Sequence, residues 1–152
     1  MIKEKELRLE TGLGGIFQEA AAFSRSSVMH GLIGDYRSKV KELGLNTKVY
    51  VDNLKIGGIV GGQIVSVIVL RHPDHLKDYE YLVINPVFLG NQYKLEYYTG
   101  GKSLLRRKFS AQENAGLAGQ IFHALSNKKA AWNQEQDYYE LLGKVAGYTY
   151  HR

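Results

Sequence analysis

The sequence predicts an α+β domain in which a long helix precedes an antiparallel sheet and further helices follow it. Three glycine-containing dipeptides lie between runs rich in Val, Ile, Leu and Tyr, namely Gly61-Gly62, Gly90-Asn91 and Gly100-Gly101. Glycine reaches positive φ angles without a Cβ clash, so these dipeptides are typical of the turns that join antiparallel strands. Before and after this region, apolar residues recur at three- and four-residue steps, which indicates helices.

Length and composition are those of one globular domain. The chain has 152 residues, of which 44% are hydrophobic and 23% charged, and it contains only two prolines. These values match the averages of folded proteins, and no linker divides the chain, so residues 1–152 are expected to form a single domain. The chain has no cysteine, which excludes disulfides, thiolate zinc sites and a cysteine nucleophile.

The charge pattern and the lack of sorting signals favour a cytoplasmic protein. Residues 1–8 alternate charges and lack the apolar core of a signal peptide. The longest apolar stretch, 64–70, is much shorter than the ~20 residues of a membrane-spanning helix, so no transmembrane segment is expected. The formal net charge of +5 favours nucleic acid, anionic lipid or an acidic protein as the partner.

The first elements are predicted to be a short strand and a long helix. Residues 7–10 form the expected edge strand. A helix is expected over 15–43, because its apolar residues would form one stripe at three- and four-residue steps. Basic residues crowd its last turns and Gly44 is a natural stop, whereas Gly31 and Gly34 are potential break points.

From residue 47 the pattern changes to that of strands. A two-residue turn at Gly61-Gly62 would place Leu54 opposite Val69, which pairs two apolar residues. Gly57 and Gly58 weaken the first arm, since glycines within a strand often mark a bulge. A bulge there would shift the predicted pairing.

The sheet is expected to continue as an antiparallel meander of about five strands. In the third strand, Pro86 indicates an edge position or a bulge, because proline donates no ladder hydrogen bond. The second glycine turn would pair Phe88 with Tyr93, and the third would pair Tyr97 with Leu104.

Two helices are expected to follow the sheet. Ser110 and Glu113 form a capping-box pattern, which predicts a helix to about Leu125. Ser126-Asn127 interrupts the pattern, and a final helix carries Trp132. This arrangement resembles cystatin-like or hot-dog-like architectures, in which a twisted antiparallel sheet wraps one helix. The analogy concerns the fold alone, because such scaffolds host enzymes, binding proteins and oligomerisation modules.

A basic, tyrosine-rich hairpin is the first candidate binding site. Cationic side chains contact phosphates and aromatic rings stack on bases, which is the physical basis of single-strand recognition. The residues expected to contact nucleic acid are Tyr93, Lys94, Tyr97, Lys102, Arg106, Arg107 and Lys108. Tyr and Lys are also ordinary residues of half-exposed strands, and charged strand edges deter aggregation.

Aromatic residues near the C-terminus form a second candidate surface, which would serve a homo-oligomer or a protein partner. They are Trp132, Tyr138, Tyr139 and Tyr148. If the last helix lies across the sheet, Trp132 and Tyr139 would be buried, whereas Tyr138 and Tyr148 would stay outside and mediate association.

No constellation typical of catalysis, of a metal site or of cofactor binding is recognisable. His72 and His75 lie beside Asp74 and Asp78, but this is an incomplete ligand set, and a solvated loop is the better interpretation. Residues 11–15 precede a helix yet lack the Gly-Lys-Ser/Thr of a phosphate loop. We therefore expect a non-catalytic binding protein without a cofactor. A small-molecule pocket between helix and curved sheet, enzymatic or not, is the third alternative.

Overall fold

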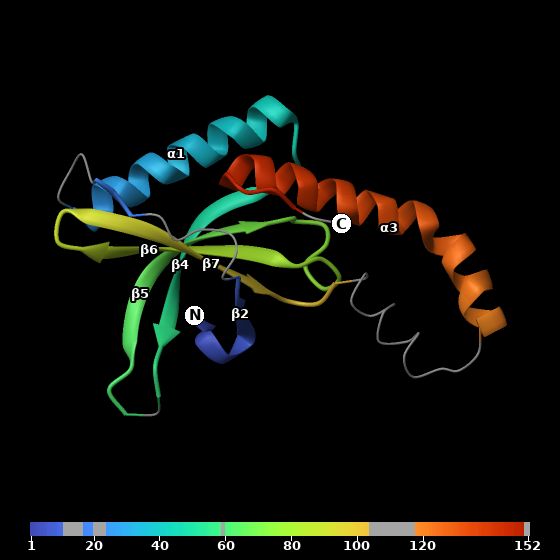
Figure 1. Ribbon diagram of the computed structural model, residues 1–152, viewed down its shortest axis with the longest axis horizontal. Coiled ribbons are helices and arrows are strands. Elements are labelled where there is room, and N and C mark those ends of the chain that lie inside the picture. Colours follow the sequence, from blue (N-terminus) through green and yellow to red (C-terminus); the bar gives the residue numbers. More distant parts are fainter. Residues whose placement is uncertain (11–16, 20–23, 59, 104–117, 151–152) are drawn as a thin grey trace.

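A curved sheet with two helices on one face forms the body of the molecule (Figure 1). The computed structural model describes residues 1–10, 17–19, 24–58, 60–103 and 118–150, with the backbone alone described over 118–130. The described elements are, in chain order, β1 (Ile2–Lys3), the 3-10 turn η1 (Glu4–Glu6), β2 (Leu7–Leu9), β3 (Gln18–Glu19), α1 (Arg25–Leu43), β4 (Lys48–Ile56), β5 (Gln63–Arg71), β6 (Tyr81–Leu89), β7 (Gln92–Gly100) and α3 (Ala118–Ala146). The α+β class is confirmed, and neither described helix is long and apolar enough to cross a membrane.

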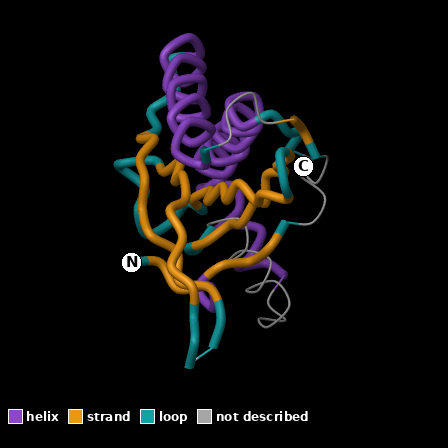
Figure 2. Tube along the Cα trace, turned by 90° about the vertical axis from the view of Figure 1, so that its left-hand side faces the viewer, coloured by secondary structure: helices purple, strands orange, loops and turns teal. Residues whose placement is uncertain are grey.

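The sheet is nearly closed into a barrel by the N-terminal segment (Figures 1 and 2). Its strand order is β1-β4-β5-β6-β7-β2, and β3 also pairs with β7. β1 runs parallel to β4 at one edge, while β2 runs antiparallel to β7 at the other. Only η1 separates β1 from β2, so one short segment pairs with both outer strands of the meander. The prediction of a purely antiparallel sheet is therefore wrong at the β1 edge.

The β4–β5 hairpin is present, but its predicted register is wrong. Leu54 pairs with Val65 rather than with Val69, and the last pair before the turn is Ile56 with Gln63. The connection thus runs from 57 to 62, because Gly57 and Gly58 leave the ladder and join the loop. Since the register shift is an even number of residues, the side chains still alternate between the two faces as expected.

The β6–β7 hairpin confirms one predicted pairing, whereas the partners on the other edge of β7 show that a second predicted pairing is wrong. Phe88 pairs with Tyr93 across the turn at Gly90-Asn91, as expected. The other edge of β7 is occupied by β2 and β3, and the Glu10 N–H donates to the Tyr97 carbonyl at 2.8 Å. The predicted pairing of Tyr97 with Leu104 is therefore wrong. Four meander strands, β4 to β7, are described, and most of the expected fifth lies outside the described residues.

Helix α1 begins at Arg25 rather than near Gly15, and it runs without a break through both of its glycines. The Ser24 hydroxyl accepts a hydrogen bond from the Ser27 N–H at 3.0 Å, which satisfies one of the free donors of the first turn. Gly44 has a left-handed φ of 62° and ends the helix, as predicted.

Helix α3 is continuous where two helices were expected. It spans Ala118–Ala146 and crosses Ser126-Asn127 without interruption, so the predicted break is wrong. Ser and Asn cost a helix interior only about 0.5 kcal/mol each relative to Ala, which neighbouring helix formers offset. The capping box predicted at Ser110 lies outside the described residues.

Apolar side chains form two cores, one on each face of the sheet. The first lies between the sheet and the helices, and its buried members include Met29, Tyr36, Ile68, Leu70, Leu82, Ile84, Tyr97, Tyr138, Tyr139, Leu142 and Val145. The second fills the inside of the near-barrel with Ile2, Leu54, Val67, Val69, Tyr81, Val83 and Tyr98. The central stretches of β5 and β6 are buried on both faces because each supplies side chains to both cores.

Arg25 bridges β5 and β6 where they separate. The β5–β6 ladder covers only three residue pairs, the last being Ile68 with Ile84. Beyond that pair the Arg25 guanidinium donates to the carbonyls of Ser66 and Pro86. A residue's N–H and C=O point to the same side of a strand, so the N–H that Pro86 lacks would also face this gap. Pro86 thus occupies an open edge of β6, as its chemistry requires.

A candidate ligand pocket beneath the C-terminal residues

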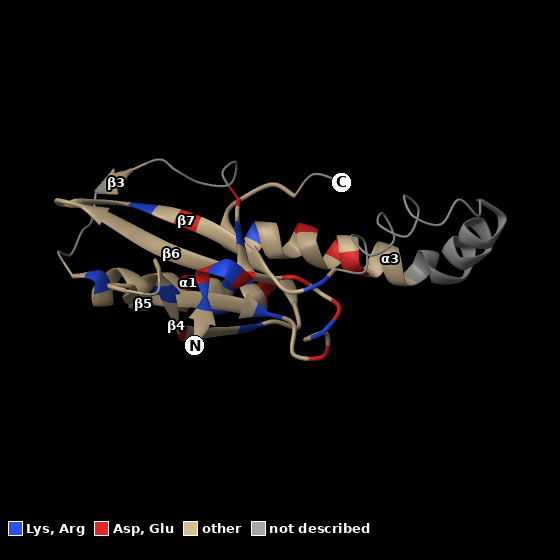
Figure 3. Cartoon of the chain, turned by 90° about the horizontal axis from the view of Figure 1, so that it is seen from below, with Lys and Arg blue, Asp and Glu red and all other residues tan. Residues whose placement is uncertain are grey.

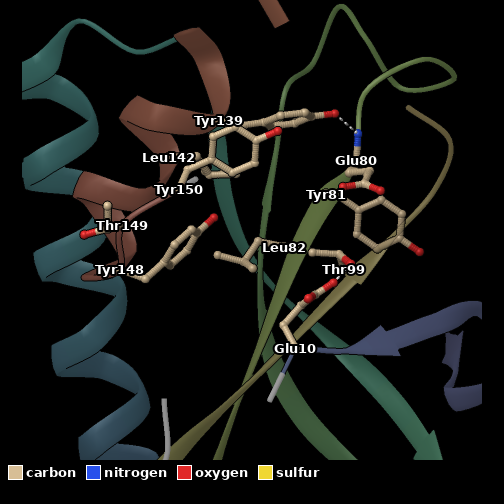
Figure 4. Close-up of a pocket in the computed structure, with 10 residues that line it drawn as sticks. All are labelled: Glu10, Glu80, Tyr81, Leu82, Thr99, Tyr139, Leu142, Tyr148, Thr149 and Tyr150. Atoms are coloured by element: carbon tan, nitrogen blue, oxygen red, sulfur yellow. Dashed lines mark hydrogen bonds between the residues drawn. The ribbon is translucent and has the colours of Figure 1, made fainter. Parts of the chain in front are cut away.

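A cavity of about 180 Å³ lies between the sheet and the C-terminal end of α3 (Figure 4). In the described part of the chain, four separate segments line it, namely the residue after β2, the start of β6, the end of β7, and α3 with the residues that follow it. The lining residues are Glu10, Glu80, Tyr81, Leu82, Thr99, Tyr139, Leu142, Tyr148, Thr149 and Tyr150. The register of the sheet brings the strand residues together, because Leu82 pairs with Thr99.

A tight turn at the end of α3 brings the last described residues to the cavity. Gly147 has a φ of 89°, and the N–H groups of Gly147 and Tyr148 both donate to the Gly143 carbonyl, at 2.8 and 2.9 Å. Gly143 also makes room for the returning chain, since a Cβ at this position would lie 2.7 Å from the Tyr148 carbonyl oxygen. The turn therefore places the Tyr148 ring at the cavity wall (Figure 4).

Two carboxylates face the cavity, and one of them is paired with a cation. The Thr99 hydroxyl donates to Glu10 Oε1 at 2.7 Å. Glu80 Oε1 accepts from Arg8 at 3.0 Å, and Arg8 also donates to the Gly101 carbonyl at 3.2 Å. These three charged side chains together carry one net negative charge, which resides at Glu10.

Tyr139 links the cavity wall to a buried carboxylate. Its hydroxyl accepts from the Glu80 N–H at 2.9 Å and donates to Glu135 Oε1 at 2.7 Å. Glu135 is 0% exposed and also accepts from the Ser103 hydroxyl at 2.8 Å. Burial raises the pKa of Tyr139 well above its usual value, so this phenol is a hydrogen-bond donor at neutral pH.

The other tyrosines form an aromatic wall. The ring centres of Tyr139 and Tyr150 are 5.4 Å apart, and those of Tyr97 and Tyr148 are 5.8 Å apart. Burial raises the pKa of Tyr148, and neighbouring acidic groups that include Glu10 raise it further. The Tyr148 phenol therefore stays neutral near pH 7, and the wall offers polarisable ring faces and hydroxyl groups.

Three of the residues predicted to bind nucleic acid, Tyr93, Lys94 and Tyr97, lie on β7. Tyr97 is 5% exposed and its hydroxyl donates to the Ala146 carbonyl at 2.8 Å, so its ring is not accessible to a base. Tyr93 and Lys94 are half-buried, and Lys94 Nζ lies 5.4 Å from the centre of the Phe17 ring.

The remaining members of that predicted site follow β7. Lys102 is exposed, whereas Arg106, Arg107 and Lys108 lie outside the described residues. Among the residues coloured by charge in Figure 3, basic and acidic positions are interspersed along the chain.

The aromatic residues predicted to form an interface pack within the chain. Tyr138 and Tyr139 are buried, and Trp132 and Tyr148 are half-buried against the first core. The expectation that Tyr138 stays outside is wrong, because its hydroxyl lies 2.7 Å from Thr47 Oγ1 in a hydrogen bond. A role of these residues in self-association stays a prediction.

His72 and His75 belong to an aromatic cluster rather than to a simple solvated loop. The His75 ring stacks on Tyr79 with centres 3.9 Å apart, and His72 packs its edge against Tyr138 at 5.1 Å. His75 Nδ1 lies 3.1 Å from an Asp78 carboxylate oxygen. In the described part of the chain, no three His, Cys, Asp or Glu side chains are grouped as metal ligands would be.

Sequence reasoning missed the polar residues of the cavity. Glu10, Glu80 and Thr99 are far apart in the sequence, and only the strand register brings them together. Glu135 did carry a signal, because with Tyr139 and Leu142 it falls on one face of a helix that is otherwise apolar. A carboxylate on such a face indicates either a buried hydrogen-bond network or a site.

Comparisons with known proteins give no family for this chain. No protein-family model, curated protein or solved structure matches it. The function must therefore be inferred from the geometry of the cavity and the chemistry of its lining.

Proposed function

We propose that this protein binds a small organic molecule in the cavity beneath its C-terminal residues. The observation that carries the proposal is the lining, which combines two carboxylates with several tyrosines on one concave surface. Ligand pockets are typically concave and mostly aromatic or apolar, with a few convergent polar groups. The cavity of about 180 Å³ is smaller than the roughly 300–1,000 Å³ of sites for drug-sized ligands, which favours a small ligand.

Hydrogen bonds within the protein already hold the lining side chains in place, so a ligand need not order them on binding. Thr99 positions the Glu10 carboxylate, the Glu80 N–H positions the Tyr139 hydroxyl, and Arg8 holds the Glu80 carboxylate. A preformed site lowers the entropic cost of binding. The raised pKa values of Tyr139 and Tyr148 make these phenols weak acids and leave almost no phenolate to act as a base at neutral pH, so we propose binding rather than proton-transfer catalysis.

The test is a substitution that fills the cavity with a larger side chain. Leu82 lines it, whereas Leu89 is 67% exposed at the other end of the same strand. A library of small amines, acids, alcohols and sugars is screened by thermal shift, and hits are measured by calorimetry. Leu82→Phe should weaken a hit at least about tenfold, equivalent to 1.4 kcal/mol, and Leu89→Phe should leave it unchanged. Equal affinities in both variants, or no hit at millimolar concentration, would contradict the proposal.

Nucleic-acid binding stays a second candidate function, supported by the net charge of +5 and by the exposed Lys102. Fluorescence anisotropy with labelled single-stranded DNA, duplex DNA and RNA at several salt concentrations tests it. Binding through phosphates should weaken steeply with salt, and Arg106→Glu with Arg107→Glu should abolish it. Unchanged affinity in that double variant would exclude the predicted hairpin as the nucleic-acid-binding site.

A further inference from the structure

We infer that the ligand of this cavity is a small organic cation, either a protonated amine or a quaternary ammonium. The inference rests on the proposed small-molecule function and specifies its ligand. It is carried by the charge of the lining, the neutral aromatic wall and the size of the cavity.

The cavity is acidic in a protein that is basic overall. Glu10 and Glu80 line it, and no lysine or arginine is among its described lining residues. Arg8 neutralises Glu80 from outside the lining, so among the described residues of the cavity Glu10 provides the uncompensated negative charge. A carboxylate in a partly enclosed site attracts a cation more strongly than one in open solvent, because less water screens it.

The rings beside this carboxylate suit the same ligand. Tyr148 and Tyr150 line the cavity together with Tyr139, and in Figure 4 the Tyr148 hydroxyl is directed into the space between Leu82 and Tyr150. The negative face of a neutral aromatic ring attracts a cation, and quaternary ammonium groups are commonly held in this way.

Other ligand classes fit less well. An anion would meet Glu10, and no lysine or arginine among the described lining residues would replace its water. A calcium or magnesium ion prefers six or more oxygen ligands, whereas the described lining residues include two carboxylates, one of which Arg8 already contacts. A neutral sugar or alcohol would pack against the rings but leave the Glu10 charge without a partner in the ligand. The experiment must therefore distinguish a neutral ligand from a cation.

The experiment compares choline with 3,3-dimethyl-1-butanol, which has the same shape but carries carbon in place of the charged nitrogen. Binding to the full chain is measured by calorimetry, alongside the amine, acid and sugar panel. Choline should bind at least about tenfold tighter than its neutral isostere. Glu10→Gln keeps an acceptor for the Thr99 hydroxyl and should remove most of this difference, whereas Glu42→Gln, an exposed position on α1, should not.

The outcomes separate this inference from the function on which it rests. If the isostere binds as tightly as choline, or if only sugars or acids bind and Leu82→Phe weakens them, the cavity is a ligand site but the cation class is wrong. If choline binding is unchanged in Glu10→Gln, the cation is not held as inferred. If no molecule of any class binds, the proposed function fails as well.

Discussion

At the level of single residues, we expect His72 to make the packing of α3 depend on pH. Its ring packs against Tyr138 of α3 and lies 4.6 Å from the His75 ring. Burial and then the neighbouring His75 lower the pKa of His72, and the opposing effects of Asp74 and Asp78 are smaller. The folded state therefore binds this proton less readily than the unfolded chain, whose histidine pKa is about 6.5.

The sign of the pH effect follows from this difference. The contribution of His72 to stability is fully present above about pH 6.5 and is lost as the pH falls below it. We expect the urea midpoint to fall between pH 7.5 and pH 5.5, and His72→Phe to reduce that fall. His30→Phe is the control, because His30 is exposed on α1. An unchanged pH dependence in His72→Phe would contradict the expectation.

At the level of elements, two glycines show how a strand and a helix differ in their tolerance of an added side chain. Gly100 lies in β7 between β6 and β2, where an added Cβ would be 2.5 Å from the Tyr81 ring and 2.8 Å from Leu7 Cδ2. Gly34 lies in α1, where no atom would be within 4 Å of the added carbon. The same substitution should therefore have opposite effects at the two positions.

Gly100→Ala should destabilise the protein by about 1–3 kcal/mol, because the Tyr81 ring inside the near-barrel must shift. Gly34→Ala should stabilise it by roughly 0.5–1 kcal/mol, because alanine loses less backbone freedom in a helix. Urea unfolding followed by circular dichroism measures both. Equal effects would mean that the packing around Gly100 is looser than these distances indicate.

For the whole molecule, local patterns predicted the turns and the positions of most strands, whereas pairing between distant strands determines which residues line the cavity. The turn at Gly90-Asn91 and the helix stop at Gly44 were predictable because each depends on a glycine at positive φ, which the sequence shows within one or two residues. The β4–β5 register was missed because Gly57 and Gly58 lengthen the loop, a choice that depends on packing rather than on turn chemistry alone.

The closure of the sheet had no local signal. Nothing within residues 2–9 indicates that β1 and β2 pair with opposite edges of the meander, since the partner strands begin about 40 or more residues later. The cavity depends on that closure, because Glu10 directly follows β2 and bonds to Tyr97 of β7. Its lining was unpredictable for the same reason.

We expect this closure to couple the stability of the two sheet edges. Ile2 is buried in the second core and pairs with Leu54. Ile2→Ala should lower the free energy of unfolding by about 2–4 kcal/mol. It should also speed amide hydrogen exchange at both edges, at Leu54 and Lys55 of β4 and at residues 98–100 of β7, because η1 joins β1 to β2. Met1→Ala, at a position 65% exposed, should change neither edge. Faster exchange at β4 alone would mean that the edges open independently and that the cavity does not depend on β1.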